Sequence, residues 1–407
     1  MPPCSATAAV ISRPAARAVR RESTTSVTTR PARCATASTV SWATVPTASP
    51  FPSFATARPS RHRVAPRDQT DQAGKAARGR LAPSPTGPLH LGNAAALLMA
   101  WLSLRSSDGT LVYRTEDLDS GRVVPGMADQ QRRELEWLGL DWDEDDTVGG
   151  NHGPYLQSLR GQRYEAALRR LDTAGLLFPC ALSRRDLAGI ASAGSAAGDS
   201  AAGDNAAAGY PARLRPDHNE PGWLERILSG EDRDNSVRLR VQNEVMNFDD
   251  LVLGPHGDNP ALGSGDFVLR RRDSLFAYQL AVVVDDIEMG ITEVVRGADL
   301  LGSTAGQLQL WHALSDREPS WAHLPLLLND AGVKLSKRDG GLELASLRAA
   351  GVSPERLVGW LAGALGLRPS AAACRPVELL SDFSLRGVVR HNISVSNAAM
   401  DELRAVS

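Results

Sequence analysis

The chain of 407 residues has no long apolar run and few cysteines. No stretch approaches the ~18 consecutive apolar residues that a membrane-spanning helix needs, so we expect no spanning segment and no membrane partner. The four cysteines, Cys4, Cys34, Cys180 and Cys374, form no close pair. Such spacing is typical of a reducing compartment and argues against a disulfide framework.

The larger part of the chain also lacks an excess of positive charge. Residues 1–67 hold ten arginines and a single acid, Glu22, whereas residues 68–407 carry a net charge of −11. A protein that binds nucleic acid through a global field would show the opposite sign. We therefore expect any RNA contact to come from local basic patches.

Two segments show no sustained periodicity in the spacing of their apolar residues. Residues 1–76 are rich in Ala, Ser, Thr, Pro and Arg, and we interpret them as a disordered tail. Their arginine-rich, acid-poor balance also fits an organelle transit peptide, and an upstream start codon in a GC-rich gene would give the same composition. We expect a cytoplasmic protein, with an organellar location as the alternative. The low-complexity insert SAAGDSAAGDNAAAG at 195–209 is expected to be a flexible surface loop.

The remaining sequence alternates between strand-like and helix-like runs. Strands are expected at the start of 79–93, at 110–117, at 236–241 (half-exposed) and at 278–286, and helices at 94–104, 127–140 and 161–178. Alternation with fully apolar strands is typical of a parallel, doubly wound α/β sheet, in which ligands bind beyond the carboxyl ends of the strands. Asp285 and Asp286, which would end the last strand, would either organise a ribose or cap that strand.

Two short motifs carry chemistry that suits a nucleotide. In PLHLGN, the residues His90, Gly92 and Asn93 lie where a strand passes into a helix; Gly92 lets the backbone approach a phosphate, and the helix N-terminus favours negative charge. KLSKRDGG is a basic loop that contains Lys334 and Lys337. Each motif alone is common as an ordinary turn or a solvated lysine pair. Together, in this order and about 240 residues apart, they predict an ATP site.

Six segments resemble, in order, the catalytic half of glutamyl-tRNA synthetases, which are class I aminoacyl-tRNA synthetases with HIGH and KMSKS signatures. These segments are RLAPSPTGPLHLGN, YRTEDLD, GPYLQS, FAYQLAVVVDD, EVVRGADLL and KLSKR. The likeness runs from about Arg80 to about Arg338, and the fourth HIGH position is Asn93, which the glutamyl group tolerates.

The resemblance implies a Rossmann-type catalytic domain in two halves, an inserted α+β subdomain and a short helical C-terminal region. The expected boundaries are 1–76 for the tail, 77–176 and 265–345 for the catalytic halves, 177–264 for the insertion with a disordered loop at 191–209, and 346–407 for the C-terminal region.

Only 69 residues follow Arg338, too few for the anticodon-binding region of the longer glutamyl-tRNA synthetases. The chain therefore looks closer to their short paralogues, the glutamyl-Q tRNA(Asp) synthetases. That resemblance implies ATP- and Mg²⁺-dependent activation of L-glutamate and its transfer to queuosine in the anticodon loop of tRNA(Asp). We expect a monomer. Two alternatives stay open: a truncated synthetase that charges the acceptor end of tRNA(Glu), and a non-catalytic tRNA-binding relic.

The resemblance also implies a glutamate pocket. Arg80 matches the arginine of the family's R-x-A-P-S-P motif and would bind the side-chain carboxylate through two parallel hydrogen bonds, while Ser84 would add a hydroxyl. Glu116 would hold the ammonium group, and Tyr278 and Arg296 match the residues that complete the pocket. Each of the five also has an ordinary interpretation, as an exposed arginine, a turn residue, a helix-start acid, a core tyrosine or a surface ion pair.

The expected reaction requires little acid–base chemistry, because the α-carboxylate of glutamate is already ionised at pH 7. Catalysis then depends on holding this carboxylate in line with the α-phosphate and on stabilising the departing pyrophosphate. His90, Asn93, Lys334 and Lys337 would supply the donors and charges.

The short paralogues often carry zinc on a Cys-x-Cys and a Tyr-x-x-x-Cys motif. The matching positions here are Cys180, Leu182, Tyr210 and Leu214. Leucine does not bind metal, so a tetrahedral site would lack two ligands. We therefore expect no zinc and no other metal ligand set, with Cys180 as a small buried residue.

Overall fold

The computed structural model describes residues 77–194, 210–335 and 342–404, all of which belong to one compact unit, Gln69–Ser407. The expectations for the tail at 1–76 and the insert at 195–209 lie outside the described residues. Residues 191–194 were expected in the loop, but they belong to helix α4 (Arg184–Gly194).

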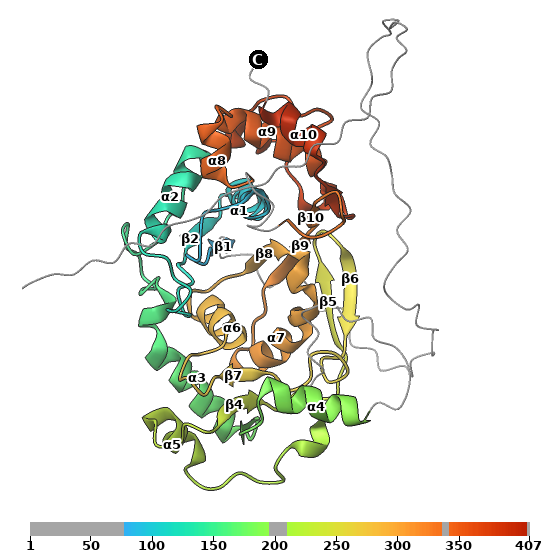
Figure 1. Cartoon of the computed structure of the whole chain (residues 1–407). Coiled ribbons are helices and arrows are strands. Elements are labelled where there is room, and N and C mark those ends of the chain that lie inside the picture. The colour runs from blue at the N-terminus through green and yellow to red at the C-terminus, as the bar shows by residue number, and fades with distance from the viewer. Residues whose placement is uncertain (1–76, 195–209, 336–341, 405–407) are drawn as a thin grey trace, which may run out of the picture. The chain divides into compact units, whose positions relative to one another are not determined.

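A mainly parallel sheet carries the site (Figure 1). Strand β1 (Arg78–Leu81) pairs in parallel with β2 (Thr110–Tyr113), and β8 (Glu293–Gly297) pairs in parallel with β9 (Ser320–Leu324). The two pairs are joined by the backbone, because the Thr292 N–H donates to the Arg78 carbonyl at 2.8 Å. This arrangement confirms the expected parallel α/β sheet.

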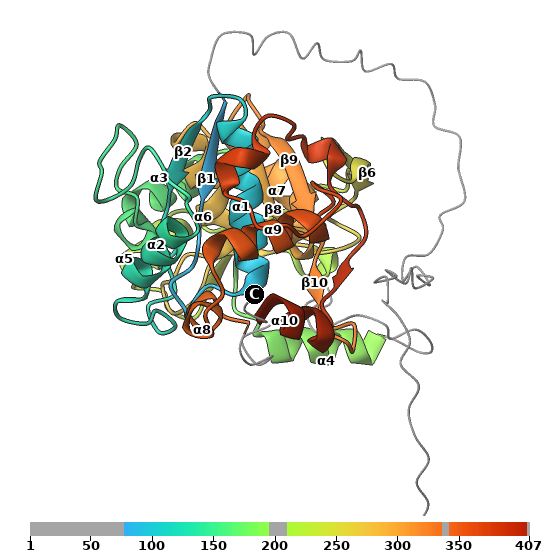
Figure 2. The same cartoon turned by 90° about the horizontal axis from the view of Figure 1, so that it is seen from above.

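The sheet continues beyond β9. Strand β5 (Met246–Asp250) lies parallel to β9, and β6 (Gly254–Asp258) pairs with β5 in the antiparallel sense. Helix α1 (Leu91–Arg105) packs against β1, β2 and β8 (Figure 2) and is buried along most of its length. Its leucines share a core with the C-terminal helices α8 (Leu344–Ala349) and α9 (Pro354–Ala364).

The expected strand at 278–286 is wrong, because this segment is helix α6 (Tyr278–Glu288). Residues 280–286 are all buried, since α6 packs against α3 (Gly161–Thr173) and α7 (Leu301–Leu314), as Figure 1 shows. A short continuous apolar run does not distinguish a buried strand from a buried helix. Asp285 and Asp286 are therefore helical and do not end a strand.

Other expected elements differ in where they end or in how far they are buried. The strand expected at 110–117 ends at Tyr113, and the helix expected at 161–178 ends at Thr173, followed by Gly175 with φ 69°. The strand β4 (Ser236–Leu239) is buried at all four positions and is not half-exposed. The Tyr210 ring covers Arg238 of this strand, whose guanidinium lies 4.8 Å from the ring centre.

The insertion expected at 177–264 contributes β3 (Leu177–Cys180) and β4 to an antiparallel sheet in the order β3–β4–β7, whose third strand, β7 (Val268–Arg270), lies beyond the expected end. Strands β5 and β6 also fall within 177–264, but they belong to the main sheet. The remaining helices are α2 (Met127–Trp137), α5 (Trp223–Ser229) and α10 (Asn397–Arg404), and β10 (Leu327–Leu328) pairs in parallel with β11 (Ile393–Ser394). Short 3₁₀ turns lie at Gln157–Leu159, Ala212–Leu214, Ala298–Leu300, Pro376–Leu379 and Leu385–Gly387. Within the described residues, no helix has the length and apolar character to cross a bilayer.

Candidate active site

The turn from β1 into α1 has a reciprocal cap at its helical end. Nδ1 of His90 accepts hydrogen bonds from the backbone N–H groups of Gly92 (3.1 Å) and Asn93 (3.3 Å), and Oδ1 of Asn93 accepts from the His90 N–H at 3.2 Å. A neutral ring that accepts at Nδ1 carries its proton on Nε2. A Cβ at Gly92 would lie 3.1 Å from the His90 ring, a tight contact that would displace the ring by a few tenths of an ångström, so glycine favours this ring position.

Helix α2 holds the same turn from the other side, which the sequence did not indicate. The buried Gln131 amide donates to the carbonyls of Ser84 (3.0 Å) and Gly87 (2.8 Å). Glu134 accepts from the Leu89 N–H at 3.0 Å. Two neighbouring polar residues of α2 therefore position the backbone that leads into the His90 cap.

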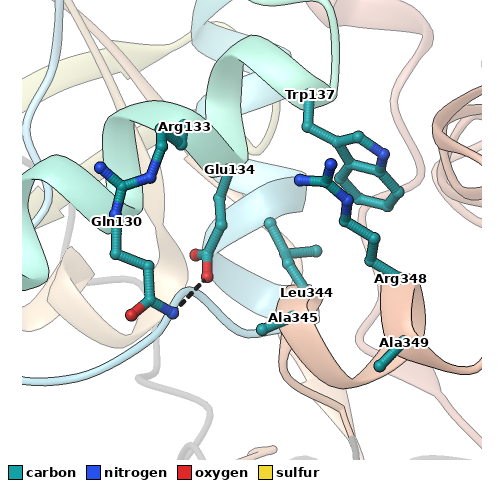
Figure 3. Close-up of a pocket in the computed structure, with 8 residues that line it drawn as sticks. All are labelled: Gln130, Arg133, Glu134, Trp137, Leu344, Ala345, Arg348 and Ala349. Carbon is teal, nitrogen blue, oxygen red and sulfur yellow. Dashed lines mark hydrogen bonds between the residues drawn. The ribbon is translucent and has the colours of Figure 1, made fainter.

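A surface hollow of about 460 Å³ lies between α2 and α8 (Figure 3). Gln130 donates to Glu134 at 2.8 Å there, and Arg348 lies 5.7 Å from the Trp137 ring centre. This hollow contains none of the residues that the sequence assigns to the site.

The predicted site residues gather instead around a second cavity of about 220 Å³. Its lining includes Arg80, His90, Gly92, Asn93, Glu116, Tyr278, Arg296 and Lys334. Ser84 is exposed and does not line this cavity, and Lys337 lies outside the described residues. The tertiary structure thus brings together eight residues spread over about 250 positions of the chain.

Arg80 is buried, and two of its three guanidinium nitrogens make hydrogen bonds. Its Nη1 donates to the Val295 carbonyl at 3.0 Å, and its Nε lies 3.3 Å from both carboxylate oxygens of Asp286. Asp286 also accepts from Nη1 of the fully buried Arg114 at 2.6 Å. Arg114 is also paired with Glu116 and Asp285, whereas the only carboxylate that Arg80 contacts among the described residues is Asp286, which it shares with Arg114. The charge of Arg80 is therefore only partly neutralised. Nη2 of Arg80 has no partner among the described residues.

Arg296 is also buried, but its contacts carry no negative charge. Within the described residues its hydrogen bonds go to neutral groups: His323, Gln307, Thr304 and the Leu300 carbonyl. Burial lowers the pKa of Arg296 to about 10, so the guanidinium stays charged at neutral pH. A buried cation without a direct counter-ion is costly and favours an anionic ligand in the cavity.

Glu116 supplies negative charge to the same cavity. Burial raises the pKa of its carboxyl group, and the neighbouring Arg114 and Arg80 oppose this shift. One carboxylate oxygen accepts from Arg114 at 3.1 Å. Tyr278, at the start of α6, also lines the cavity, and burial raises the pKa of its hydroxyl to about 12. The hydroxyl therefore stays protonated and can donate a hydrogen bond.

Lys334 lies at the open side of the cavity, where its Nζ pairs with Asp299 at 2.5 Å. Asp299 belongs to the 3₁₀ turn that follows β8, and it also lines the cavity. This acid was missed from the sequence, because its contact with the lysine loop joins positions 35 residues apart.

Asp285 has neither of the roles considered from the sequence. It lies fully buried on α6 and accepts hydrogen bonds from Gln157 (2.7 Å), Arg160 (2.5 Å) and Tyr164 (3.0 Å). Together with Asp286 it anchors buried arginines beneath the cavity. Both acids support the site by holding these arginines in place, and they reach the arginines because they lie on a helix.

The four positions that correspond to zinc ligands in the short paralogues do come together. Cys180 and Tyr210 are buried in one apolar cluster, against which Leu182 and Leu214 pack. The Tyr210 hydroxyl donates to the Leu214 carbonyl at 2.9 Å. These residues do not fit a zinc ion, since two of the four offer only methyl groups. No group of three His, Cys, Asp or Glu side chains suited to a metal occurs in the described ranges.

Comparison with known proteins agrees with this geometry. A family model for the catalytic domain of class I tRNA synthetases (E and Q) matches residues 76–397. The glutamyl-Q tRNA(Asp) synthetase of Symbiobacterium thermophilum is 45% identical over 320 residues, which cover 78% of this chain and 95% of that protein. The corresponding protein of Nitratidesulfovibrio vulgaris is also 45% identical, over 76% of this chain and 93% of its own length.

A solved structure adds evidence for the fold. The glutamate tRNA ligase from Elizabethkingia meningosepticum, in complex with its amino acid, superposes with a TM-score of 0.69 at 28% identity, over 81% of this chain and 69% of that chain. The matched family residues include the His90 turn, the lysine loop and every strand of the parallel sheet. The chain therefore belongs to the class I tRNA synthetases (E and Q).

Proposed function

We propose that the chain activates L-glutamate with ATP and transfers it to queuosine in the anticodon loop of tRNA(Asp). The observation that carries the glutamate assignment is the charge pattern of the cavity. Arg80 and Arg296 are buried cations whose charge is incompletely neutralised, and Glu116 is a partly buried acid in the same wall. Glutamate has two carboxylates and one ammonium, which is the complementary set.

The first step joins glutamate to the nucleotide. An oxygen of the α-carboxylate forms a bond to the α-phosphorus of ATP, the bond to pyrophosphate breaks, and glutamyl-adenylate results. Magnesium enters with ATP and neutralises part of the phosphate charge. The His90 turn and Lys334 line the nucleotide end of the cavity and would hold the phosphates in line with the carboxylate.

The second step moves glutamate to RNA. A queuosine hydroxyl attacks the carbonyl carbon of the adenylate and loses its proton, and AMP leaves. The assignment to tRNA(Asp) is supported by relatives named glutamyl-Q tRNA(Asp) synthetase, which the chain matches over 93–95% of their length. We also propose a cytoplasmic monomer without bound zinc.

The lysine loop is unusual within this chain. The protein contains only three lysines, Lys75, Lys334 and Lys337, beside 42 arginines. Two of the three lie in KLSK, which argues against an ordinary solvated lysine pair. Lys337→Ala should lower glutamate-dependent exchange of pyrophosphate into ATP by ~10²-fold or more, because a charge directed at the transition state is lost. Lys75→Ala is the matched control and should leave the rate unchanged.

The RNA substrate is tested with labelled glutamate on three RNAs: tRNA(Asp) with queuosine, unmodified tRNA(Asp) and tRNA(Glu). We expect label on the first RNA alone, and this label should survive selective removal of the 3′-terminal nucleoside. Label on the acceptor end of tRNA(Glu), with none on queuosine, would identify a truncated glutamyl-tRNA synthetase. Wild-type protein without any glutamate-dependent exchange, with or without tRNA, would refute the enzyme assignment.

A further inference from the structure

Three neighbouring strands of the sheet place Asp250, His323 and Arg296 in a row. The register of β8 and β9 pairs Arg296 with His323, so both side chains leave the same face of the sheet. Asp250 ends β5, which lies on the other side of β9. Its carboxylate accepts from the His323 backbone N–H at 3.0 Å and lies 2.6 Å from Nδ1 of the His323 ring. His323 and Asp250 are buried.

The contacts determine which ring nitrogen of His323 carries the proton. Nδ1 faces the Asp250 carboxylate, so this nitrogen is the donor. Nε2 is then an acceptor, and it lies 3.0 Å from the Arg296 Nε and 3.1 Å from the Thr304 hydroxyl. Protonation at Nε2 would turn an N–H towards the guanidinium N–H and add a second positive charge. Burial lowers the pKa of His323, which favours the neutral ring.

The surrounding elements supply further titratable groups: Tyr278, Arg80, Asp286 and Asp299 act on Arg296 through space, and His256 acts on His323. His256 on β6 stacks on Phe248, which in turn lies 6.3 Å from the His323 ring. Helix α7 contributes only the uncharged Thr304 and Gln307 to the Arg296 contacts. Through hydrogen bonds, Arg296 therefore reaches the acid Asp250 by way of one imidazole ring, whereas Asp286 and Asp299 act on Arg296 only through space.

We propose that the Asp250–His323 pair positions Arg296 for a carboxylate of the substrate glutamate. This inference rests on the proposed function, because it takes glutamate as the ligand of Arg296. The neutral acceptor on His323 orients the planar guanidinium without cancelling its charge by direct contact. An acid in direct contact with Arg296 would orient the guanidinium equally well but would compete with the substrate carboxylate. His323 is thus a positioning residue that acts through Arg296.

Kinetics of the His323 variants test the inference in the full-length protein. His323→Phe keeps a planar ring but removes the acceptor, and we expect kcat/KM for glutamate to fall by ~10²-fold, with the KM for ATP within ~3-fold of wild type. His323→Gln can offer its amide oxygen to Arg296, and it should restore activity to within ~10-fold of wild type. His256→Gln, on β6 and so two strands away from His323, is the matched control and should leave both KM values unchanged.

A spectroscopic measurement decides the geometry without relying on catalysis. In protein labelled with ¹⁵N-histidine, His323 should show protonated Nδ1 and unprotonated Nε2 at pH 7. The Arg296 Nε–H resonance, assigned by its loss in Arg296→Lys, should weaken or shift in His323→Phe and persist in His323→Gln. If His323→Phe does not fold, Asp250→Asn provides the same comparison, because it removes the charge that holds the proton on Nδ1.

The outcomes separate the inference from the proposed function. A proton on Nε2, or an Arg296 resonance that is indifferent to His323→Phe, would overturn the positioning role. Active wild-type enzyme with an unchanged glutamate kcat/KM in His323→Phe would overturn it too and leave the proposed function intact. Wild-type protein without glutamate-dependent exchange would overturn the proposed function and the substrate named here, whereas the resonances would still report whether the pair holds Arg296.

Discussion

Arg296 shows at the scale of one residue how strongly the pocket depends on side-chain shape. A lysine at this position would keep the charge, but its single ammonium group could not contact His323, Gln307 and Thr304 together. We expect Arg296→Lys to raise the KM for glutamate by ~10- to 10²-fold, because hydrogen bonds to charged groups contribute about 1.5–3 kcal/mol each. Initial-rate exchange assays at varied glutamate measure this change. An equal rise in the KM for ATP would point to general misfolding and contradict the prediction.

At the scale of secondary-structure elements, helix α2 contributes both to the stability of the protein and to the turn at the nucleotide end of the site. The Gln131 amide bonds two carbonyls of the turn that precedes His90. Gln131→Ala should lower the free energy of unfolding by about 1–3 kcal/mol, because the buried Gly87 carbonyl and the partly buried Ser84 carbonyl lose their partner. It should also raise the KM for ATP, since the turn loses its support. Urea unfolding and exchange assays test both effects.

The neighbouring residue provides the control for that prediction. Gln130 is only half-buried and bonds Glu134, with no direct contact to the turn. Gln130→Ala should therefore have the smaller effect on both quantities. If the two variants behaved alike, the role of Gln131 in holding the turn would be wrong.

The inserted antiparallel sheet makes a separate prediction about metal. Leu182 and Leu214 pack where zinc ligands would be needed beside Cys180 and Tyr210. Purified protein should contain less than ~0.1 zinc per chain, and its melting temperature should not change with a chelator, because no zinc-binding energy contributes to folding. Elemental analysis and thermal unfolding with and without the chelator measure this. One zinc per chain would require ligands outside this cluster.

At the scale of the whole molecule, Glu144 makes the stability of the protein depend on pH, through its contact with a strand of the sheet. It accepts hydrogen bonds from Arg78 on β1 at 2.7 Å and from Tyr155 at 2.6 Å. Burial alone would raise the pKa of Glu144, but the hydrogen bonds from Arg78, Tyr155 and His152 lower it to about 2. The folded pKa lies below the ordinary 4.5, so this stabilisation is complete above about pH 4.5 and is lost as the pH falls towards 2.

A charge-neutral variant tests that pH dependence. Glu144→Gln should reduce the free energy of unfolding at pH 7, and the difference from wild type should shrink between pH 4.5 and pH 2. Urea unfolding of both proteins across this range measures the difference. A difference that stayed constant from pH 7 to pH 2.5 would show that packing, and not the charge of Glu144, carries the contribution.

The amino-acid sequence by itself determined the class of the molecule and most of the charged and polar residues that line the cavity. The HLGN turn and the lysine loop could be predicted because short motifs need particular residue types at fixed spacing, and the resemblance to the glutamyl-tRNA synthetases implied Arg80, Glu116 and Arg296. It also indicated the parallel sheet, whose apolar and amphipathic runs alternate along the chain.

The tertiary structure decided what no local pattern contains. The run at 278–286 forms a helix because α3 and α7 cover it, and a buried run lacks the polar stripe that would reveal its period. That helix directs Asp285 and Asp286 to buried arginines 125 and 206 positions away. His323 meets Arg296 through strand register alone. Long-range pairing therefore assigned the supporting residues, because their partners are neighbours in space and are far apart in the sequence.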